Sequence, residues 1–407
     1  MLSPCSIGWN DANMEIPETS DFYDIASMLT DDERDIQRRV RDFVDESVLP
    51  VINEHWEAAT MPLSLLDGLR DLGVVGTTIR GYGCPGMSRT AAGLVAQELS
   101  RGDGSVNTIN AVQSGLVMGS IERFATEEQK QRWLPRLARV ESLGAFALTE
   151  PDHGSDSVGL ETSARRDGDG WVIDGRKRWI GLGSVADIVV ICARDVEDGR
   201  VKGFVMERDG DEYPEGYQPT VIEGKIAKRA VWQADIVIEG LRVREADRLP
   251  GARSFRDFST LLASTRTTVA WEAVGHAIAA FEIARDYALA REQFGKPIAS
   301  YQLVQNKLAN MLADLTSLRL LVLRASRLQD EGRLSNSQAS LAKLLTGQRA
   351  RTICREARDM LGGNGLLLER HVARHLLDME VVHTYEGTDS IQSLIVGREI
   401  TGIAAFS

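Results

Sequence analysis

The sequence of 407 residues has few of the features that mark secreted, metal-binding or membrane-spanning proteins. It contains four cysteines, Cys5, Cys84, Cys192 and Cys354, which form no CxxC pair and no zinc-type spacing with histidine. No apolar run approaches the length of a membrane span. We therefore expect reduced, structural cysteines, no metal site and no membrane insertion.

Positive charge is also scarce, because 47 Lys and Arg face 59 Asp and Glu, for a formal net charge of -12. This excess repels the phosphate backbone of nucleic acids, so we expect no nucleic-acid partner. The N-terminus carries Asp11, Glu15, Glu18 and Asp21 without a preceding arginine, which argues against a secretory signal or an Arg-rich transit peptide. The expected location is cytoplasmic.

Hydrophobic periodicity divides the chain into helical, strand-like and again helical parts. The clearest helical stripe consists of Val304, Leu308, Met311, Leu315, Leu318, Val322 and Ala325. Capping-box signatures at Thr30 and Thr126 mark helix starts, and Asp167-Gly168 with Asp169-Gly170 marks a hairpin.

These patterns predict an α+β fold in which a small β domain lies between two helical ones. We expect an N-terminal helical domain over residues 1–143, a middle β-barrel-like domain over 144–245 and a C-terminal four-helix bundle over 246–407. The segment from Gly81 to Gly86 satisfies GxGxxG, but Pro85 stands where the turn should lead into a helix, so we reject a Rossmann site.

Five short segments carry chemistry and follow one another in a recognisable order. They are FALTEPDHGSD (146–156), KRWIG (177–181), REQFGKP (291–297), GGNG (362–365) and YEGT (385–388). Each alone is a weak signal, but together they resemble the acyl-CoA dehydrogenase family over nearly the whole chain. Residues 81–86, 385–391 and 397–402 resemble most the glutaryl-CoA dehydrogenase branch, which also contains short-chain acyl-CoA oxidases.

The resemblance implies FAD-dependent α,β-desaturation of an acyl-CoA thioester. This reaction needs an electron sink that no side chain provides and a carboxylate base in a dry pocket. The family's base is the glutamate of the YEGT motif, here Glu386, although a lone Glu-Gly dipeptide is ordinarily a solvated turn. Gly387 leaves room for the thioester, and the backbone N–H of Glu386 resembles the family's donor to the thioester oxygen.

The resemblance also implies an FAD site. The backbone of Phe146, Ala147, Leu148 and Thr149 is expected along the flavin ring, Ser155 at the pyrophosphate, and Trp179, Ile180 and Gly181 against the ring. The positions that match the adenine and pyrophosphate end, partly from a neighbouring subunit, are Arg291, Phe294, Gln302, Asp359, Met360, Leu361, Gly362, Gly363, Thr388 and Phe406. A homo-oligomer, specifically a tetramer, follows from this sharing, although Asp359 departs from the glutamine or glutamate of other members.

Substrate contacts are implied for a further set of residues. They are Asn107, Thr108, Ser155, Ser259, Leu262, Arg266 and Gly387. From the local sequence alone, Arg266 is equally well interpreted as a surface ion-pair residue.

Asn107 stands where glutaryl-CoA dehydrogenases have the arginine that holds the distal carboxylate, and an asparagine cannot neutralise a buried carboxylate. We therefore expect a short or medium acyl-CoA without a terminal acid. The alternative is that Asn107 caps a helix and another residue holds the carboxylate of glutaryl-CoA.

The electron acceptor is expected to be an electron-transfer flavoprotein. Gly181, where many dehydrogenases have threonine and the short-chain oxidases have glycine, keeps an O2-dependent acyl-CoA oxidase open. A carrier-protein thioester as substrate, and a flavin-binding assembly protein without redox activity, are the remaining alternatives.

Overall fold

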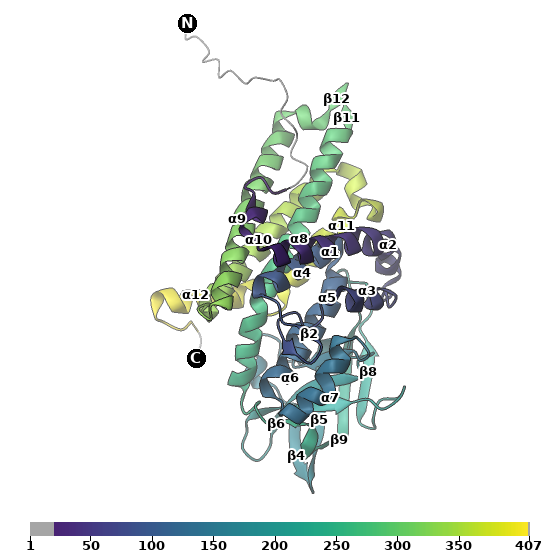
Figure 1. The fold of residues 1–407 in the computed structure, drawn as a ribbon, viewed down its shortest axis with the longest axis vertical. Helices are drawn as coiled ribbons and strands as arrows, with labels where there is room; N and C mark the ends of the chain where they lie inside the picture. Colours follow the sequence, from purple (N-terminus) through teal and green to yellow (C-terminus); the bar gives the residue numbers. More distant parts are fainter. Residues whose placement is uncertain (1–19, 406–407) are drawn as a thin grey trace.

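The computed structural model describes residues 20–405. Cys5, the acidic N-terminal residues before Ser20 and the candidate cofactor residue Phe406 lie outside the described residues. The molecule is elongated, with the β sheet at one end and a pair of long helices reaching the other (Figure 1). This arrangement is the α+β fold that the sequence predicts, with a β domain between two helical parts.

The N-terminal part is built from short helices. They are α1 (Asp31–Phe43), α2 (Leu49–Ala58), α3 (Leu65–Leu72), α4 (Arg89–Gly102), α5 (Gly104–Ala111), α6 (Gly119–Phe124) and α7 (Glu127–Ala138), with π-helical segments at Val44–Val48 and Val112–Met118. Thr30 and Thr126 both form complete capping boxes, which confirms those two helix starts. Gly81 and Gly83 of GxGxxG lie in the hairpin of β1 (Arg80–Gly81) and β2 (Cys84–Pro85), and Gly86 follows β2, so none of the three begins a helix.

The middle part is one twisted sheet. Its strands are β3 (Gly144–Ala147), β4 (Ser163–Asp167), β5 (Gly170–Gly181), β6 (Ile188–Asp195), β7 (Val201–Glu207), β8 (Tyr217–Val221), β9 (Gln233–Arg244) and β10 (Arg248–Leu249). The order is β10-β7-β6-β4-β5-β9-β8, with β3 parallel to β6. The expected hairpin is confirmed, since β4 and β5 pair through Asp167 and Gly170. The last strand of the sheet, β10, ends at Leu249, beyond the expected domain limit at 245/246. That limit and the one at 143/144 remain proposals.

The C-terminal part is helical. It comprises α8 (Phe255–Ala290), the hairpin of β11 (Glu292–Gln293) and β12 (Lys296–Pro297), α9 (Gln302–Asp330), α10 (Asn336–Met360), α11 (Val372–Thr384) and α12 (Asp389–Thr401). The stripe on α9 is buried from Met311 to Ala325, as its spacing predicts, whereas Val304 and Leu308 are only partly buried.

Two glycines bring α8 close to α4. A Cβ atom at Gly93 would lie 2.2 Å from Nε1 of Trp271, and one at Gly275 would lie 2.2 Å from the carbonyl oxygen of Gln97. Any larger residue at either position would push the helices apart. This close packing sets α8 beside α4, which leads directly into α5, the helix that carries Asn107 and Thr108.

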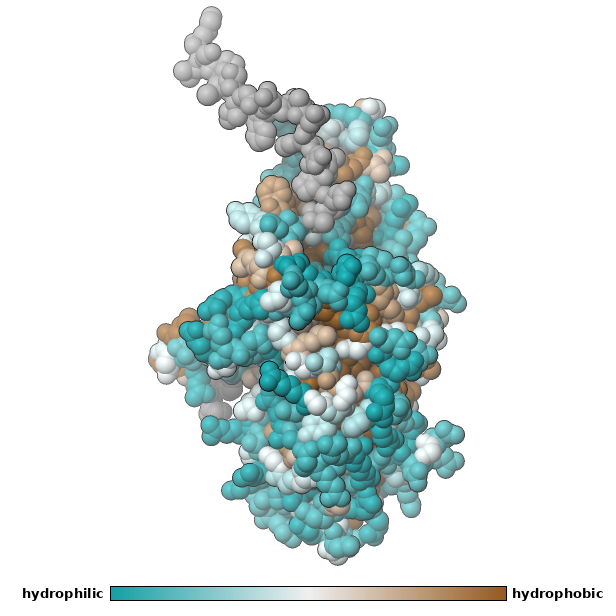
Figure 2. Space-filling model, viewed as in Figure 1, coloured by the Kyte–Doolittle hydropathy of each residue, from teal (hydrophilic) through white to brown (hydrophobic). Residues whose placement is uncertain are grey.

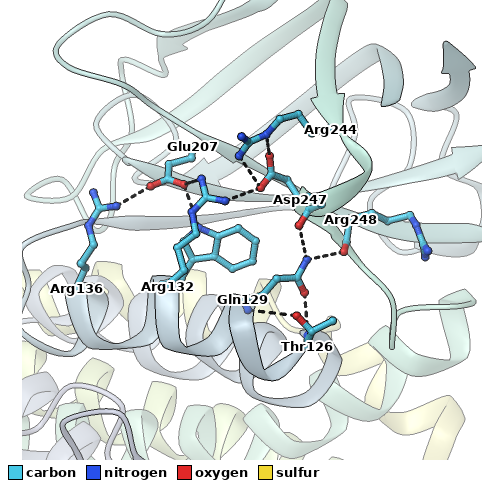
Figure 3. A network of polar contacts seen from close by, with 10 residues as sticks. Thr126, Gln129, Arg132, Arg136, Glu207, Arg244, Asp247 and Arg248 are labelled. Atoms are coloured by element: carbon cyan, nitrogen blue, oxygen red, sulfur yellow. Dashed lines mark hydrogen bonds and ion pairs between the residues drawn. The ribbon is translucent and has the colours of Figure 1, made fainter. Parts of the chain in front are cut away.

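Polar contacts fix the sheet to α7 (Figure 3). Glu207, at the end of β7, accepts a hydrogen bond from Arg136 at 2.6 Å and forms an ion pair with Arg132. Arg132 also donates a hydrogen bond to Asp247 at 2.8 Å. The amide of Gln129 donates to two carbonyl oxygens of the segment at Ala246 and Arg248, each at 2.8 Å. The sheet is thereby held in place relative to the helices.

Hydrophilic residues dominate the sheet end of the face in Figure 2, and hydrophobic residues gather near its middle. Within residues 20–405, none of the helices combines the length and the apolar character needed to cross a membrane.

Candidate active site

Glu386 lies in the turn between α11 and α12, with a left-handed backbone φ of 54°. Its Oε2 accepts a hydrogen bond from the hydroxyl of Thr265 on α8 at 2.8 Å. The amide of Gln392 donates to the carbonyl oxygens of Glu386 and Gly387, both at 3.0 Å, and Lys343 Nζ donates to the Gly387 carbonyl at 2.5 Å. These bonds hold an unfavourable backbone conformation and direct the carboxylate toward α8.

The carboxylate of Glu386 is surrounded by protein, and this burial raises its pKa above the ordinary value. The hydrogen bond from Thr265 and the charges of Arg266 and Lys343 oppose the rise, whereas the negative charge of Glu272 adds to it. Burial also lowers the pKa of Lys343 to about 8. A carboxylate with a raised pKa is a stronger proton acceptor, which is the property that a base at this place needs.

Partly exposed residues within otherwise buried segments lie around Glu386, and from them we infer an interior space beside its carboxylate. Residues 269–281 of α8 are all buried, but Thr265 and Thr268 are partly exposed, and so are Tyr385 and Glu386. Two glycines show which segments meet there. A Cβ atom at Gly115 would lie 3.5 Å from Cγ2 of Thr265, and one at Gly181 would lie 3.2 Å from Cγ2 of Val112. The end of β5, the segment after α5 and the middle of α8 therefore border one site.

The candidate flavin residues of the sheet lie together. The stretch from Phe146 to Thr149 lies against β5, because the backbone N–H of Arg178 donates to the Thr149 carbonyl at 2.8 Å and Lys177 Nζ donates to the Leu148 carbonyl at 3.0 Å. The β5–β9 register shifts between Lys177 and Ile180, and the intervening Trp179 has a φ of 62°.

This bulge leaves 52% of Trp179 exposed beside the stretch that ends at Thr149, while Gly181 is partly exposed at the end of β5. An exposed indole is unusual in a strand and offers a flat apolar surface for an aromatic ring. The residues present thus fit a bound flavin. Ile180 is buried in the sheet core, and Ser155 lies on an exposed loop.

The remaining candidate cofactor residues do not join this group within one chain. Phe294, at the tip of the β11–β12 hairpin, is 94% exposed, and Arg291 and Gln302 flank it at the end of the molecule remote from the sheet (Figure 1). Asp359 forms an ion pair with Lys307. It ends α10 with Met360, and buried Leu361 and exposed Gly362 and Gly363 follow. Thr388, next to the Glu386 turn, caps α12 by accepting the N–H of Ile391 at 3.3 Å.

Arg266 lies inside the molecule, 9% exposed. It donates to the amide oxygen of Asn336 and to Ser340 Oγ at 3.4 Å, and within residues 20–405 no carboxylate lies in ion-pair distance of it. Its interpretation as a surface ion-pair residue is therefore wrong. Its charge lies close enough to Glu386 to affect that carboxyl's pKa. Ser259 and Leu262, on the preceding turns of α8, are partly exposed.

Asn107 lies inside α5 and does not cap it, because Asp103 is the cap and accepts the N–H of Ser105 at 2.7 Å. Asn107 is 1% exposed, and neither of its side-chain polar atoms has a partner in the described part of the chain. The neighbouring Thr108 accepts a hydrogen bond from Lys228 Nζ at 2.7 Å.

Sequence reasoning missed Lys228 and its ion-pair partner Glu272, both of which are buried. Lys228 looks like one member of a basic, solvated loop that includes Lys225 and Arg229. Glu272 did give a signal, since it is an acidic residue inside an otherwise apolar stretch of α8.

The chain matches three family models in succession. They are described as the N-terminal domain of acyl-CoA dehydrogenase (residues 30–141), its middle domain (145–241) and its C-terminal domain (255–401).

Relatives align over most of their length. The mitochondrial short-chain specific acyl-CoA dehydrogenase of Bos taurus is 32% identical, over 98% of this chain and 95% of the relative. A glutaryl-CoA dehydrogenase of Mycobacterium smegmatis, solved with FADH2, is 38% identical with a TM-score of 0.92, over 95% of this chain and 98% of that one. Butyryl-CoA dehydrogenase of Megasphaera elsdenii is 30% identical with a TM-score of 0.86, over 91% and 98% of the two chains.

Proposed function

Because the chain belongs to the FAD-dependent acyl-CoA dehydrogenase family, we propose that it desaturates a short or medium acyl-CoA without a terminal carboxylate, with Glu386 as the base. The observation that carries this proposal is the enclosed carboxylate of Glu386, bonded to Thr265 and partly exposed to an interior space. Bound FAD supplies the two-electron oxidant that no side chain can provide.

Three residues at the site have separate roles in the proposed reaction. Glu386 accepts the α-proton, and its raised pKa makes that transfer easier. Gly387 has a φ of 87°, a conformation open to glycine, and a Cβ atom there would lie 2.5 Å from Nε2 of Gln392, so glycine is needed to form the turn that presents Glu386. Arg266 adds a positive charge near the place where negative charge develops, which favours the enolate-like transition state.

The distal end of the site does not suit a carboxylate. Lys228 is the cation near Thr108, but it is already paired with Glu272. Bringing a second carboxylate there would leave one negative charge without a partner in a buried place. This argument, together with Asn107, favours a monocarboxylic acyl group over glutaryl-CoA.

We expect butyryl-CoA to reduce the flavin of the purified holoenzyme in an anaerobic titration at least about a hundredfold faster than glutaryl-CoA, since a mispaired buried charge costs about 3 kcal/mol or more. Absorbance at the flavin band measures both rates. Preferential reduction by glutaryl-CoA would show that Lys228 releases Glu272 to hold the distal acid.

Thr265→Val removes the hydrogen bond that lowers the pKa of Glu386, so that pKa should rise further. Since only the deprotonated carboxylate accepts a proton, the rising limb of the rate of flavin reduction against pH should move to higher pH. Thr265→Ser keeps the hydroxyl and serves as the matched control. If the limb stays in place in the valine variant, the hydroxyl does not act on the base.

A second candidate function is an acyl-CoA oxidase, which Gly181 favours because no Cβ atom fills the space toward Val112 at the end of β5. Stoichiometric formation of hydrogen peroxide from acyl-CoA in air would establish it. Under the leading proposal, reoxidation requires an electron-transfer flavoprotein and peroxide stays low.

We also propose a homotetramer in the cytoplasm. The support for the assembly is that Arg291, Phe294 and Gln302 lie far from the flavin residues of their own sheet (Figure 1), so they would have to serve a neighbouring subunit. Sedimentation of the holoenzyme tests this assembly.

A further inference from the structure

A buried group of four polar side chains lies close to the site of Glu386. Lys228, 2% exposed, donates to the hydroxyls of Thr108 at 2.7 Å and Tyr385 at 2.9 Å and forms an ion pair with Glu272. Tyr385 donates its own proton to Glu272. We call Lys228, Thr108, Tyr385 and Glu272 the floor cluster.

The cluster lies two helical turns from the base along α8. Thr265, which bonds Glu386, is followed on the same helical face by Thr268 and then Glu272, because residues three and four apart share a face. Seven residues of α-helix span about 10 Å. Thr265 and Thr268 are partly exposed and Glu272 is buried, so the interior space extends from the base toward Glu272 and ends there.

The segment from Thr108 to Gly115 faces α8 and runs antiparallel to it, with the same seven-residue spacing between its two ends. Gly115 lies next to Thr265 at the base end, and Thr108, seven residues earlier, joins Glu272 through Lys228 at the other end. Residues 111 and 112, between them, are partly exposed, whereas Thr108 is buried. Two antiparallel helical faces therefore flank one space, with Glu386 at one end and the floor cluster at the other.

The hydrogen bonds of the floor cluster leave only acceptors free. The ammonium group of Lys228 has three N–H donors, and all three are used. The hydroxyl of Thr108 donates to the Gly104 carbonyl at 2.8 Å. Glu272 accepts from Lys228 and Tyr385, and His276 Nε2 lies 3.9 Å from its Oε1. Because a carboxylate has room for about four hydrogen bonds, acceptor positions remain.

The floor cluster is also neutral as a whole. Burial opposes the ionisation of Glu272, but the charge of Lys228 and the nearby His276 hold its pKa down, at about 2, so the carboxylate stays ionised. One positive and one negative charge then cancel.

We propose that the floor cluster selects short acyl groups that carry an uncharged hydrogen-bond donor, such as a hydroxyl, at the end remote from the thioester. This inference rests on the proposed function, in which the acyl chain occupies the space beside Glu386. A hydroxyl can donate to the free acceptor sites of Glu272 or Thr108. A carboxylate cannot donate and meets the negative charge of Glu272, and a methyl group displaces water without replacing its hydrogen bonds.

The test compares acyl-CoAs in which a terminal methyl is replaced by a hydroxyl at equal size. The pairs are pentanoyl-CoA with 4-hydroxybutyryl-CoA and hexanoyl-CoA with 5-hydroxypentanoyl-CoA. In the anaerobic holoenzyme, dissociation constants come from the change in the flavin spectrum on binding, and rates from its bleaching. We expect the hydroxylated member of at least one pair to bind about tenfold more tightly, as one hydrogen bond to a charged group allows.

Two variants test whether the cluster is responsible. Lys228→Met with Glu272→Leu removes both charges together, so no unpaired charge is left buried, and the preference should reverse toward the methyl compound. Thr108→Val keeps the ion pair and should reduce the preference. Thr267→Val is the matched control, because it removes a buried hydroxyl from another face of α8 and should leave the preference unchanged.

The outcomes separate this inference from the proposed function. Equal binding within both pairs by the unmodified protein, or an undiminished preference in both floor variants, overturns the inference. If the double variant does not fold, Thr108→Val decides. If the acyl-CoAs bind but none bleaches the flavin, the proposed dehydrogenation is wrong. The dissociation constants of the hydroxylated and methyl compounds still test the role of the floor cluster in that case.

Discussion

Glu386→Gln should abolish reduction of the flavin by acyl-CoA while leaving FAD bound. The glutamine has nearly the same shape and can still contact Thr265, but it cannot accept the α-proton. General-base catalysis contributes about 10²- to 10⁴-fold, so we expect a loss near or above the upper end of that range. Stopped-flow absorbance of the anaerobic enzyme measures the rate, and the flavin-to-protein absorbance ratio measures cofactor content.

The control for this variant is Glu380→Gln. Glu380 lies on α11, before the same turn, but its carboxylate pairs with Arg351 at 2.7 Å and is 43% exposed. Its replacement should leave both the rate and the flavin content unchanged. An undiminished rate in Glu386→Gln would exclude this residue as the base, and a loss of FAD in that variant would instead indicate a structural role.

The second large effect is expected from Arg374→Met. Arg374 is fully buried and pairs with Asp103, which is also fully buried. Arg374 further donates to Asn53 at 2.8 Å and to the Gly102 carbonyl at 3.2 Å. Removing one partner of a buried pair leaves a charge without compensation and costs about 3–5 kcal/mol. We expect a marked fall in the thermal unfolding midpoint of the holoenzyme.

A matched surface substitution and a double variant complete this test. Arg370→Met removes an arginine whose ion pair with Glu369, at 3.4 Å, is solvent-exposed, and such pairs contribute about 0–1 kcal/mol. Asp103→Asn together with Arg374→Met should recover part of the lost stability, because neither charge then remains buried. Equal midpoints for the two single variants would show that the buried pair adds no stability.

The Arg374–Asp103 pair also bears on catalysis. Asp103 caps α5, which carries Thr108, and Arg374 lies on α11, which leads into the turn of Glu386. The pair thus ties the segment beside the acyl space to the segment that carries the base. A partly folded Arg374→Met protein should therefore lose activity before it loses all of its helical signal.

Several features of the fold could be predicted because they depend on neighbouring residues. The capping boxes at Thr30 and Thr126 need only four consecutive residues, and the hairpin at Asp167 needs only its turn. The buried stripe on α9 follows from the helical period. The exact end of the sheet did not follow, because the short strand β10 is defined by its pairing with β7.

Only part of the candidate site could be predicted from the sequence. The motifs led to Glu386 and to the stretch at Phe146, and FAD dependence is confirmed by the family. The local sequence does not distinguish a substrate contact from a surface ion pair for Arg266, because its burial depends on the packing of α10. The sequence also allows Asn107 to cap a helix, but the structure shows that Asp103 is the N-cap of α5.

The sequence by itself determined the order of the helical and strand-rich parts and the cofactor class, and it provided a candidate proton acceptor, since short motifs and local periodicity carry that information. Only the tertiary structure decided what surrounds the acyl space. Lys228 meets Glu272 across 44 residues and Tyr385 across 157, and Thr265 meets Glu386 across 121. Contacts over such separations are set by how whole helices pack, and a local pattern contains no record of that packing.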